Sequence, residues 1–173
     1  ALKKPFTPRE VAVWRGESLA GKRLLLLGEQ GIGDSMMFAT LIPKLQDEGA
    51  KISLLPGDRL VSIYKRSLPD VNILTLNELQ NQLLGSNDFD FQSPLGSICQ
   101  YRFPQISDYG IKNNFLKADS RKTNELRQRY FDGRPLIGIS WQGGGKVSRI
   151  HLKSHKLLEM SPLLKRTDVR FVS

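Results

Sequence analysis

Residues 24–35 read Leu-Leu-Leu-Leu-Gly-Glu-Gln-Gly-Ile-Gly-Asp-Ser, and the fold prediction is built outward from this stretch. Consecutive leucines predict a strand that is covered on both faces, as in a parallel sheet. Glycines then permit backbone angles and close approaches that a side chain would prevent. Asp34 and Ser35 favour a helix start, and an apolar helical periodicity follows them. The stretch therefore predicts a strand, a glycine turn (residues 28–33) and a helix, an arrangement at which open α/β sheets bind ligands.

Two phosphate-binding templates can be compared with the glycine turn, and neither fits. A dinucleotide fingerprint needs G-x-G-x-x-G and an acid about twenty residues later. Here the spacing is G-x-x-G-x-G, and the next predicted strand ends without an acid. A P-loop frame would place Gly28, Gly33 and Ser35 correctly, but Asp34 occupies the lysine position. A carboxylate there would repel a phosphate, so nucleoside triphosphate hydrolysis is excluded.

Two interpretations of Asp34 remain open from the residues alone. The side chain could cap the helix, or it could face a cleft as a general base for a hydroxyl group. A helix N-terminus favours the charged carboxylate, which tends to weaken a base. Glu29 and Gln30 could also face this cleft or could be solvated.

The rest of the chain predicts strands and helices in alternation. Strands are expected at residues 23–27, 51–55, 71–76, 89–92, 136–141 and 169–172. Helices are expected at residues 34–48 with a break near Pro43, 59–67 capped by Asp58, 78–84 capped by Asn77, 120–132, and 157–164 interrupted at Pro162. Residues 93–114 are expected to be irregular. This order predicts an α/β fold with parallel sheets and right-handed crossovers.

The strand, glycine loop and helix pattern occurs twice, around Gly31 and around Gly144. We therefore expect two Rossmann-like units. The predicted division is a lead-in at residues 1–20 with Trp14 as a packing anchor, a first domain at 21–133, and the beginning of a second domain at 134–173. Two strands and one helix cannot bury a sheet alone, so the second domain is expected to be truncated.

Composition narrows the class of protein. Hydrophobic residues make up 39% of the chain, and we find no apolar run long enough to span a membrane and no secretory signal pattern. The single Cys99 excludes an internal disulfide and, together with two histidines, offers no zinc ligand set. These features predict a cytoplasmic protein without a metal.

The positive charge is concentrated near the C-terminus. Residues 134–173 contain eight Lys and Arg against Glu159 and Asp168, a net charge of +6 within a total of +9. This excess surrounds the second glycine turn. A solvated surface or a polyanion-binding surface would each explain it.

Several segments closely resemble bacterial glycosyltransferases that follow tetratricopeptide repeats. These enzymes are related to the lipopolysaccharide heptosyltransferases and, more distantly, to the O-linked N-acetylglucosamine transferases. The most specific segment is Glu29-Gln-Gly-Ile-Gly-Asp34. Supporting matches cover nearly the whole chain and lie at residues 14–22, 25–28, Phe38, Pro43, 67–71, 93–95, 137–141 and 171–173.

The resemblance implies a GT-B architecture, in which two Rossmann-like domains flank a cleft and no metal is required. The acceptor would bind the first domain, and a nucleoside-diphosphate sugar would bind the second. Tetratricopeptide repeats are expected upstream. The acceptor would be a glycan, a lipid or a protein, and its identity is left open.

The resemblance also assigns roles to individual residues. Asp34 matches the general base of the heptosyltransferases, which favours that interpretation over the cap. Glu29, Gln30, Gly31 and Gly33 would form the acceptor-side loop. Trp141, Gln142, Gly143, Lys153 and Ser154 match the region that borders the donor diphosphate. Lys146 and Arg149 are added to these donor residues for their charge, which would stabilise the departing diphosphate. The chain departs from the family at Gly144-Gly145, where an Asn-Pro-like pair is usual, and at Ile150, where an acid is common.

These features predict metal-independent, inverting transfer of a sugar from a nucleoside-diphosphate sugar to an acceptor hydroxyl, although this length of chain alone could be inactive. The alternative is a non-catalytic binding module or scaffold. Its basic C-terminal region would then contact nucleic acid or another polyanion. No nucleic-acid-binding motif is visible in the sequence, which disfavours that alternative.

Overall fold

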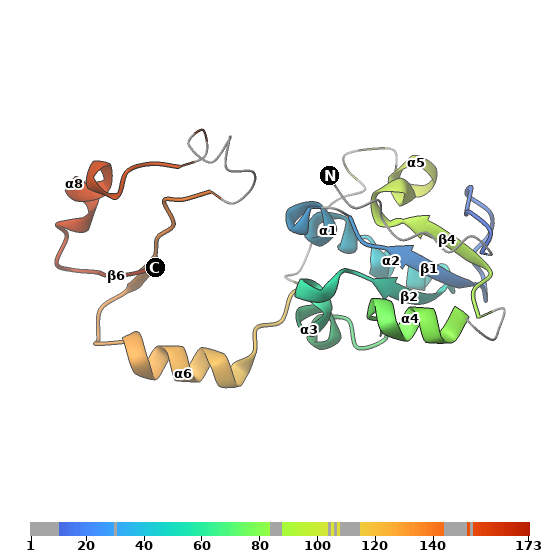
Figure 1. Ribbon diagram of the computed structural model, residues 1–173, viewed down its shortest axis with the longest axis horizontal. Coiled ribbons are helices and arrows are strands. Elements are labelled where there is room, and N and C mark those ends of the chain that lie inside the picture. The colour runs from blue at the N-terminus through green and yellow to red at the C-terminus, as the bar shows by residue number, and fades with distance from the viewer. Residues whose placement is uncertain are drawn as a thin grey trace. The chain divides into compact units, whose positions relative to one another are not determined.

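The computed structural model describes residues 11–29, 31–83, 88–103, 105, 107, 115–143, 152 and 154–173. The chain divides into two compact units, Ala1–Ala118 and Asp119–Ser173 (Figure 1). The division precedes α6 (Ser120–Tyr130), whereas the sequence placed the boundary after that helix. No helix in the described part of the chain is long and apolar enough to cross a membrane.

The first unit contains a parallel sheet of four strands in the order β3-β2-β1-β4. The strands are β1 (Arg23–Leu27), β2 (Lys51–Leu55), β3 (Asn72–Ile73) and β4 (Phe91–Pro94). This confirms the predicted α/β class with a parallel sheet and is consistent with a Rossmann-like fold. The chain adds β2 and then β3 on one side of β1, and it then returns to add β4 on the other side. The strand order therefore reverses between β1 and β4, and we call this point the chain reversal.

Helices connect these strands. They are α1 (Ile32–Ala39), α2 (Ile42–Asp47), α3 (Asp58–Ser67), α4 (Leu76–Leu83) and, after β4, the 3-10 turn η1 (Leu95–Ser97) followed by α5 (Ile98–Arg102). The predicted helix 34–48 is therefore two helices. Pro43 lies in the first turn of α2, where its missing N–H costs no hydrogen bond.

Both faces of the first sheet are covered by apolar side chains. Leu24 and Leu26 belong to a buried cluster that includes residues of α1, α2, α3 and α5. Leu25 and Leu27 point to the opposite face, where they pack with Leu79 of α4. Because successive side chains of a strand alternate between faces, the run of leucines supplies both layers at once.

The lead-in joins the edge of this sheet. Val13 forms a parallel bridge with Gln92 of β4, and the Trp14 N–H donates to the Gln92 carbonyl at 2.9 Å. The indole of Trp14 is 1% exposed and lies against Tyr101 and the Arg102 guanidinium. This confirms the prediction that Trp14 is a packing anchor.

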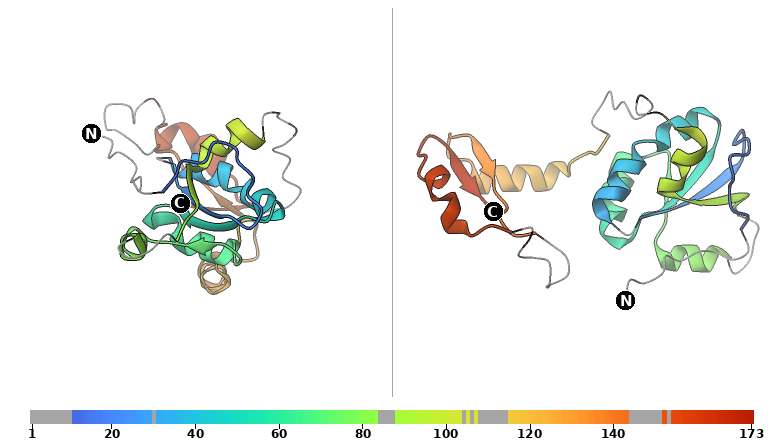
Figure 2. Two further views of the ribbon diagram at one scale, coloured as in Figure 1. Left: turned by 90° about the vertical axis from the view of Figure 1, so that its right-hand side faces the viewer. Right: turned by 90° about the horizontal axis from the view of Figure 1, so that it is seen from above.

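The second unit contains a parallel pair of strands, β5 (Leu136–Gly138) and β6 (Arg170–Val172). They are accompanied by α6, the 3-10 helix η4 (Leu157–Met160) and α8 (Ser161–Leu164) (Figure 2). All three residues of β5 are exposed. Among the described residues of this unit, Val169 is the one buried apolar side chain. The second unit therefore has much less core than the first.

Candidate functional site

The glycine turn begins where the end of β1 lies against the end of β2. The Gly28 N–H donates to the Leu55 carbonyl at 2.8 Å. A Cβ at Gly28 would lie 2.9 Å from backbone atoms of both Leu55 and Pro56. Because backbone atoms cannot rotate away, this position requires glycine. The close approach fixes where the chain leaves the carboxyl end of β1.

Buried hydrogen bonds of Ser35 hold the glycine turn together. The Ser35 side chain is fully buried, and its hydroxyl oxygen accepts the Glu29 N–H at 2.9 Å. The same hydroxyl lies 3.3 Å from the Glu29 carbonyl, to which it can donate, and the Ser35 N–H donates to the Gly31 carbonyl at 3.0 Å. These bonds connect the end of β1 directly to the first turn of α1. The sequence favoured Ser35 only as a helix-start residue.

Glu29 links the turn to the opposite side of the chain reversal. Its Oε1 accepts the N–H of Gly96 in η1 at 2.7 Å. The side chain is half-buried rather than fully solvated. In open α/β sheets the crevice between the two strands at such a reversal is the usual ligand site. No sequence signal identifies Gly96 as the partner, because it lies 67 residues away along the chain.

Asp34 is the third residue of α1 and is exposed. The N-cap of this helix is Gly31, and no side chain caps it, so the interpretation of Asp34 as the N-cap is wrong. A negative charge in the first turn is nevertheless favourable, because the N-terminus of a helix carries partial positive charge. A Cβ at Gly31 would collide with the Asp34 carboxylate, which therefore lies back over the glycine turn. A Cβ at Gly33 would meet open space.

Two adjacent pockets open at the carboxyl ends of β1 and β2, with volumes of about 230 and 190 Å³. We call them together the β1–β2 crevice. Both are lined by Glu29, Pro56, Gly57 and Asp58. Asp34 is not among the residues lining either pocket. Two acidic residues, Glu29 and Asp58, therefore line the crevice, and Asp34 is exposed on the helix that follows β1.

The second predicted loop brings together four of the proposed donor residues. The Gly143 N–H donates to the Ser154 hydroxyl at 3.0 Å, and the His155 N–H donates to the Trp141 carbonyl at 2.8 Å. Gln142 lies between Trp141 and Gly143 and is exposed. The Gly143 N–H is thus already bonded and is not presented to an anion. Gln30, Lys146, Arg149 and Lys153 lie outside the described residues, as do Gly144, Gly145 and Ile150.

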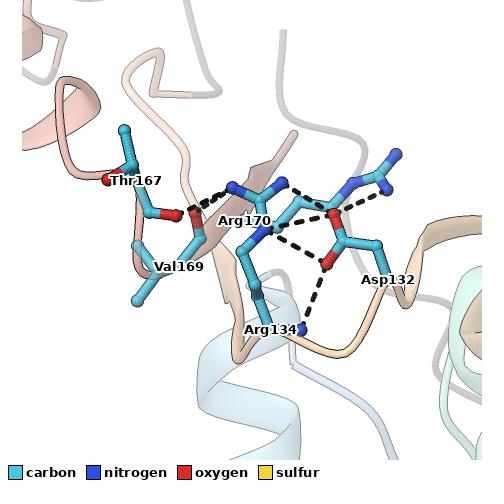
Figure 3. A network of polar contacts seen from close by, with 5 residues as sticks. All are labelled: Asp132, Arg134, Thr167, Val169 and Arg170. Atoms are coloured by element: carbon cyan, nitrogen blue, oxygen red, sulfur yellow. Dashed lines mark hydrogen bonds and ion pairs between the residues drawn. The ribbon is translucent and has the colours of Figure 1, made fainter.

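Three arginines of the basic C-terminal region form ion pairs in the structure. Arg134 bonds the Asp132 carboxylate through Nε and Nη2, with the shortest contact at 2.7 Å (Figure 3). Arg170 adds a contact to the same carboxylate at 3.2 Å. Arg166 pairs with Asp168. Hydrogen bonding from the Arg134 guanidinium holds the pKa of Asp132 well below its usual range.

This network lies at the beginning of β5 and β6, because Asp132 and Arg134 precede β5 and Arg170 starts β6. Arg134 also donates to the Thr167 carbonyl at 2.9 Å, which joins the two strand entries. The loop at Trp141 follows the other end of β5. Part of the basic excess therefore stabilises the second unit at the end of its strands opposite to that loop.

Comparisons with known proteins add one distant relative. The chain is 23% identical over 163 residues to Protein FlbA of Caulobacter vibrioides, a match that covers 86% of this chain and 26% of FlbA. The chain thus spans about a quarter of the length of this curated relative. No protein-family model matches the chain. No solved structure matches it either.

Proposed function

We propose that this chain is part of a glycosyltransferase of GT-B type, similar to the heptosyltransferases and to the transferases that follow tetratricopeptide repeats. It would transfer a sugar from a nucleoside-diphosphate sugar to an acceptor hydroxyl, without a metal and with inversion. The observation that carries the proposal is the position of Asp34. Its exposed carboxylate lies on the first turn of α1, which follows the carboxyl end of β1. Open parallel α/β sheets commonly bind ligands at this edge.

The proposed chemistry follows from the charges involved. The acceptor hydroxyl would lose its proton to Asp34 while its oxygen forms a bond to the anomeric carbon. The bond from that carbon to the diphosphate would break, and the departing nucleoside diphosphate would gain negative charge. Lys146, Arg149 and Lys153 would stabilise this charge, since cationic side chains bind phosphate oxygens strongly. Trp141, Gln142 and Ser154 would border the diphosphate.

Glu29 would form the acceptor side together with Gln30, Gly31 and Gly33. The β1–β2 crevice supports this assignment, because Glu29 lines both of its pockets. The acceptor is a glycan, a lipid or a protein in this proposal. Upstream tetratricopeptide repeats and a cytoplasmic location belong to the same proposal.

Replacement of Asp34 by Asn tests the role of the carboxylate. We expect Asp34→Asn to lower turnover by a factor of about 100 or more, because general bases typically contribute this much. Turnover is measured as nucleoside diphosphate release in the longest natural chain that contains this sequence. The matched control is Asp47→Asn, which neutralises an exposed carboxylate at the end of α2. Full activity of Asp34→Asn would refute the assigned base.

Thermal shift measurements distinguish the transferase from a polyanion-binding module. A nucleoside diphosphate that binds the folded state should raise the melting temperature, since at 100 times its Kd it adds about 2.7 kcal/mol of stability. Stabilisation by a single-stranded oligonucleotide alone, lost as salt rises, would instead indicate nucleic-acid binding. The ion pairs of Arg134, Arg166 and Arg170 favour the first outcome, because they leave fewer unpaired cations for a polyanion.

A further inference from the structure

The hydrogen bond between Glu29 and Gly96 is the basis of an inference that rests on the proposed function and extends it. β1 and β4 pair along their length, and Leu27 and Pro94 are the last partners in register. Beyond this point the two segments diverge, and β1 leads to α1 while β4 leads to η1. The Glu29 carboxylate crosses this separation and accepts the Gly96 N–H at 2.7 Å.

The bond occupies a site where the surrounding atoms leave little freedom. A Cβ at Gly96 would lie 3.0 Å from Glu29 Oε1 and 3.0 Å from Cε2 of Phe38. Phe38 lies four residues after Asp34 in α1, and residues at this spacing share one side of a helix. The same glycine therefore contacts the carboxylate at the end of β1 and the helix that carries Asp34.

One further bond extends this constraint to the first turn of α1, which carries Asp34. The Glu29 N–H donates to Ser35 Oγ at 2.9 Å, so the backbone of Glu29 is fixed to the residue that follows Asp34. The Ser35 side chain is fully buried, which prevents solvent from replacing this bond. Rotation of α1 about its start would break the bond at Ser35 or the contact at Phe38.

We propose that Glu29 is a positioning residue. Its carboxylate ties the glycine turn to η1 across the chain reversal and thereby fixes the first turn of α1, which carries Asp34, at the carboxyl edge of the sheet. The role requires a side-chain oxygen that accepts the Gly96 N–H, and it does not require a negative charge. Glu29→Gln should therefore preserve the function of Glu29, and Glu29→Ala should remove it.

Two NMR measurements test the inference without any assay of sugar transfer. Glu29→Ala should speed hydrogen exchange at the Gly96 amide and shift the carboxyl ¹³C resonance of Asp34, whereas Glu29→Gln should leave both close to wild type. Gly96→Ala changes the donor residue of the same hydrogen bond and should also shift the Asp34 resonance. The control Asp47→Ala removes an exposed carboxylate on α2 and should change neither signal. Faster exchange at Gly96 with an unchanged Asp34 resonance in Glu29→Ala would overturn the proposal.

Kinetic measurements test the functional consequence. We expect Glu29→Ala to lower kcat by about 10- to 100-fold with little change in the KM of the donor, because a small misplacement of a reacting group costs rate rather than binding. Glu29→Gln should restore most of kcat. Equal loss in both variants would show that Glu29 acts through its charge and would overturn the positioning role. Full activity of Asp34→Asn would refute the proposed general base. It would not refute the positioning role of Glu29, which the NMR comparison of Glu29→Ala with wild type tests separately.

Discussion

At the scale of single residues, the glycines of the turn differ in what they require. Gly28 faces backbone atoms of β2, which cannot move without displacing the strand. Gly33 faces open space and lies in the first turn of α1. The same residue type in one motif therefore reflects a packing constraint at one position and leaves room for a side chain at another.

A pair of substitutions tests this difference. Gly28→Ala should destabilise the fold by about 1–3 kcal/mol, as overpacking of a rigid site typically does. Gly33→Ala should be neutral or stabilising by up to about 1 kcal/mol, because alanine favours the helix more than glycine does. Urea denaturation followed by circular dichroism measures both values. Equal effects of the two substitutions would contradict the packing argument.

At the scale of secondary-structure elements, side chains around the start of α4 define where the helix begins. The Thr75 hydroxyl accepts the Glu78 N–H at 3.2 Å, and the Glu78 carboxylate accepts the Thr75 N–H at 2.6 Å. This reciprocal pair is a capping box. The predicted cap Asn77 is therefore wrong, because it lies inside the first turn. Asp58 likewise lies inside α3, whose N-cap is Gly57.

The two candidate caps of α4 can be separated by mutation. Thr75→Ala should lower stability by about 1 kcal/mol, because it removes the acceptor for an otherwise unpaired helix N–H. Asn77→Ala should change stability by less than about 0.5 kcal/mol, as exposed substitutions away from such features usually do. Thermal denaturation of both variants provides the comparison. A larger loss for Asn77→Ala would contradict the assigned capping box.

At the scale of the whole molecule, the two units differ in how much apolar surface they bury. The first unit has a core on both faces of its sheet. In the described part of the second unit, large apolar side chains such as Phe131 and Leu158 are 60% and 81% exposed. Burial of apolar surface is the main source of folding stability, so we expect the second unit to have a lower free energy of unfolding than the first.

Limited proteolysis of the 173-residue chain should reveal this difference. We expect cleavage within residues 119–173 first, because weakly packed regions open more often and expose their backbone to protease. A fragment ending close to Ala118 should persist and be identified by mass spectrometry. Persistence of the second unit with loss of the first would contradict the comparison of their cores.

Local patterns predicted the main strands well. The prediction for β1 and β2 is confirmed at both ends, because a run of buried apolar residues bounded by turn residues has few alternatives. The alternation at residues 89–92 predicted β4 two residues too early. The Asp90 carboxylate instead accepts hydrogen bonds from the Arg23 backbone N–H, at 2.7 Å, and from the Arg23 guanidinium, at the entry to β1. Such long-range pairing leaves no local signal.

The candidate site shows the same limit. The sequence predicted the glycine turn and proposed Asp34 as a site residue beside it, because the residue types and spacing that suggest both lie within a few positions. It did not identify the contact between Glu29 and Gly96, which depends on where β4 joins the sheet. The partners in the ion pairs Asp132–Arg134 and Arg166–Asp168 are only two residues apart, so neighbouring charges in the sequence do predict these pairs.

The pairing of the lead-in with β4 has a practical consequence for producing the first unit by itself. The Gln92 side chain donates to the Val11 carbonyl at 2.6 Å, and the Gln92 N–H donates to the Ala12 carbonyl at 2.8 Å. A chain trimmed to start at Lys22 would leave those groups facing solvent along a bare strand. Unpaired edge strands tend to pair between molecules, so such a shortened protein should precipitate or self-associate. A protein that begins ahead of Val11 should stay monodisperse.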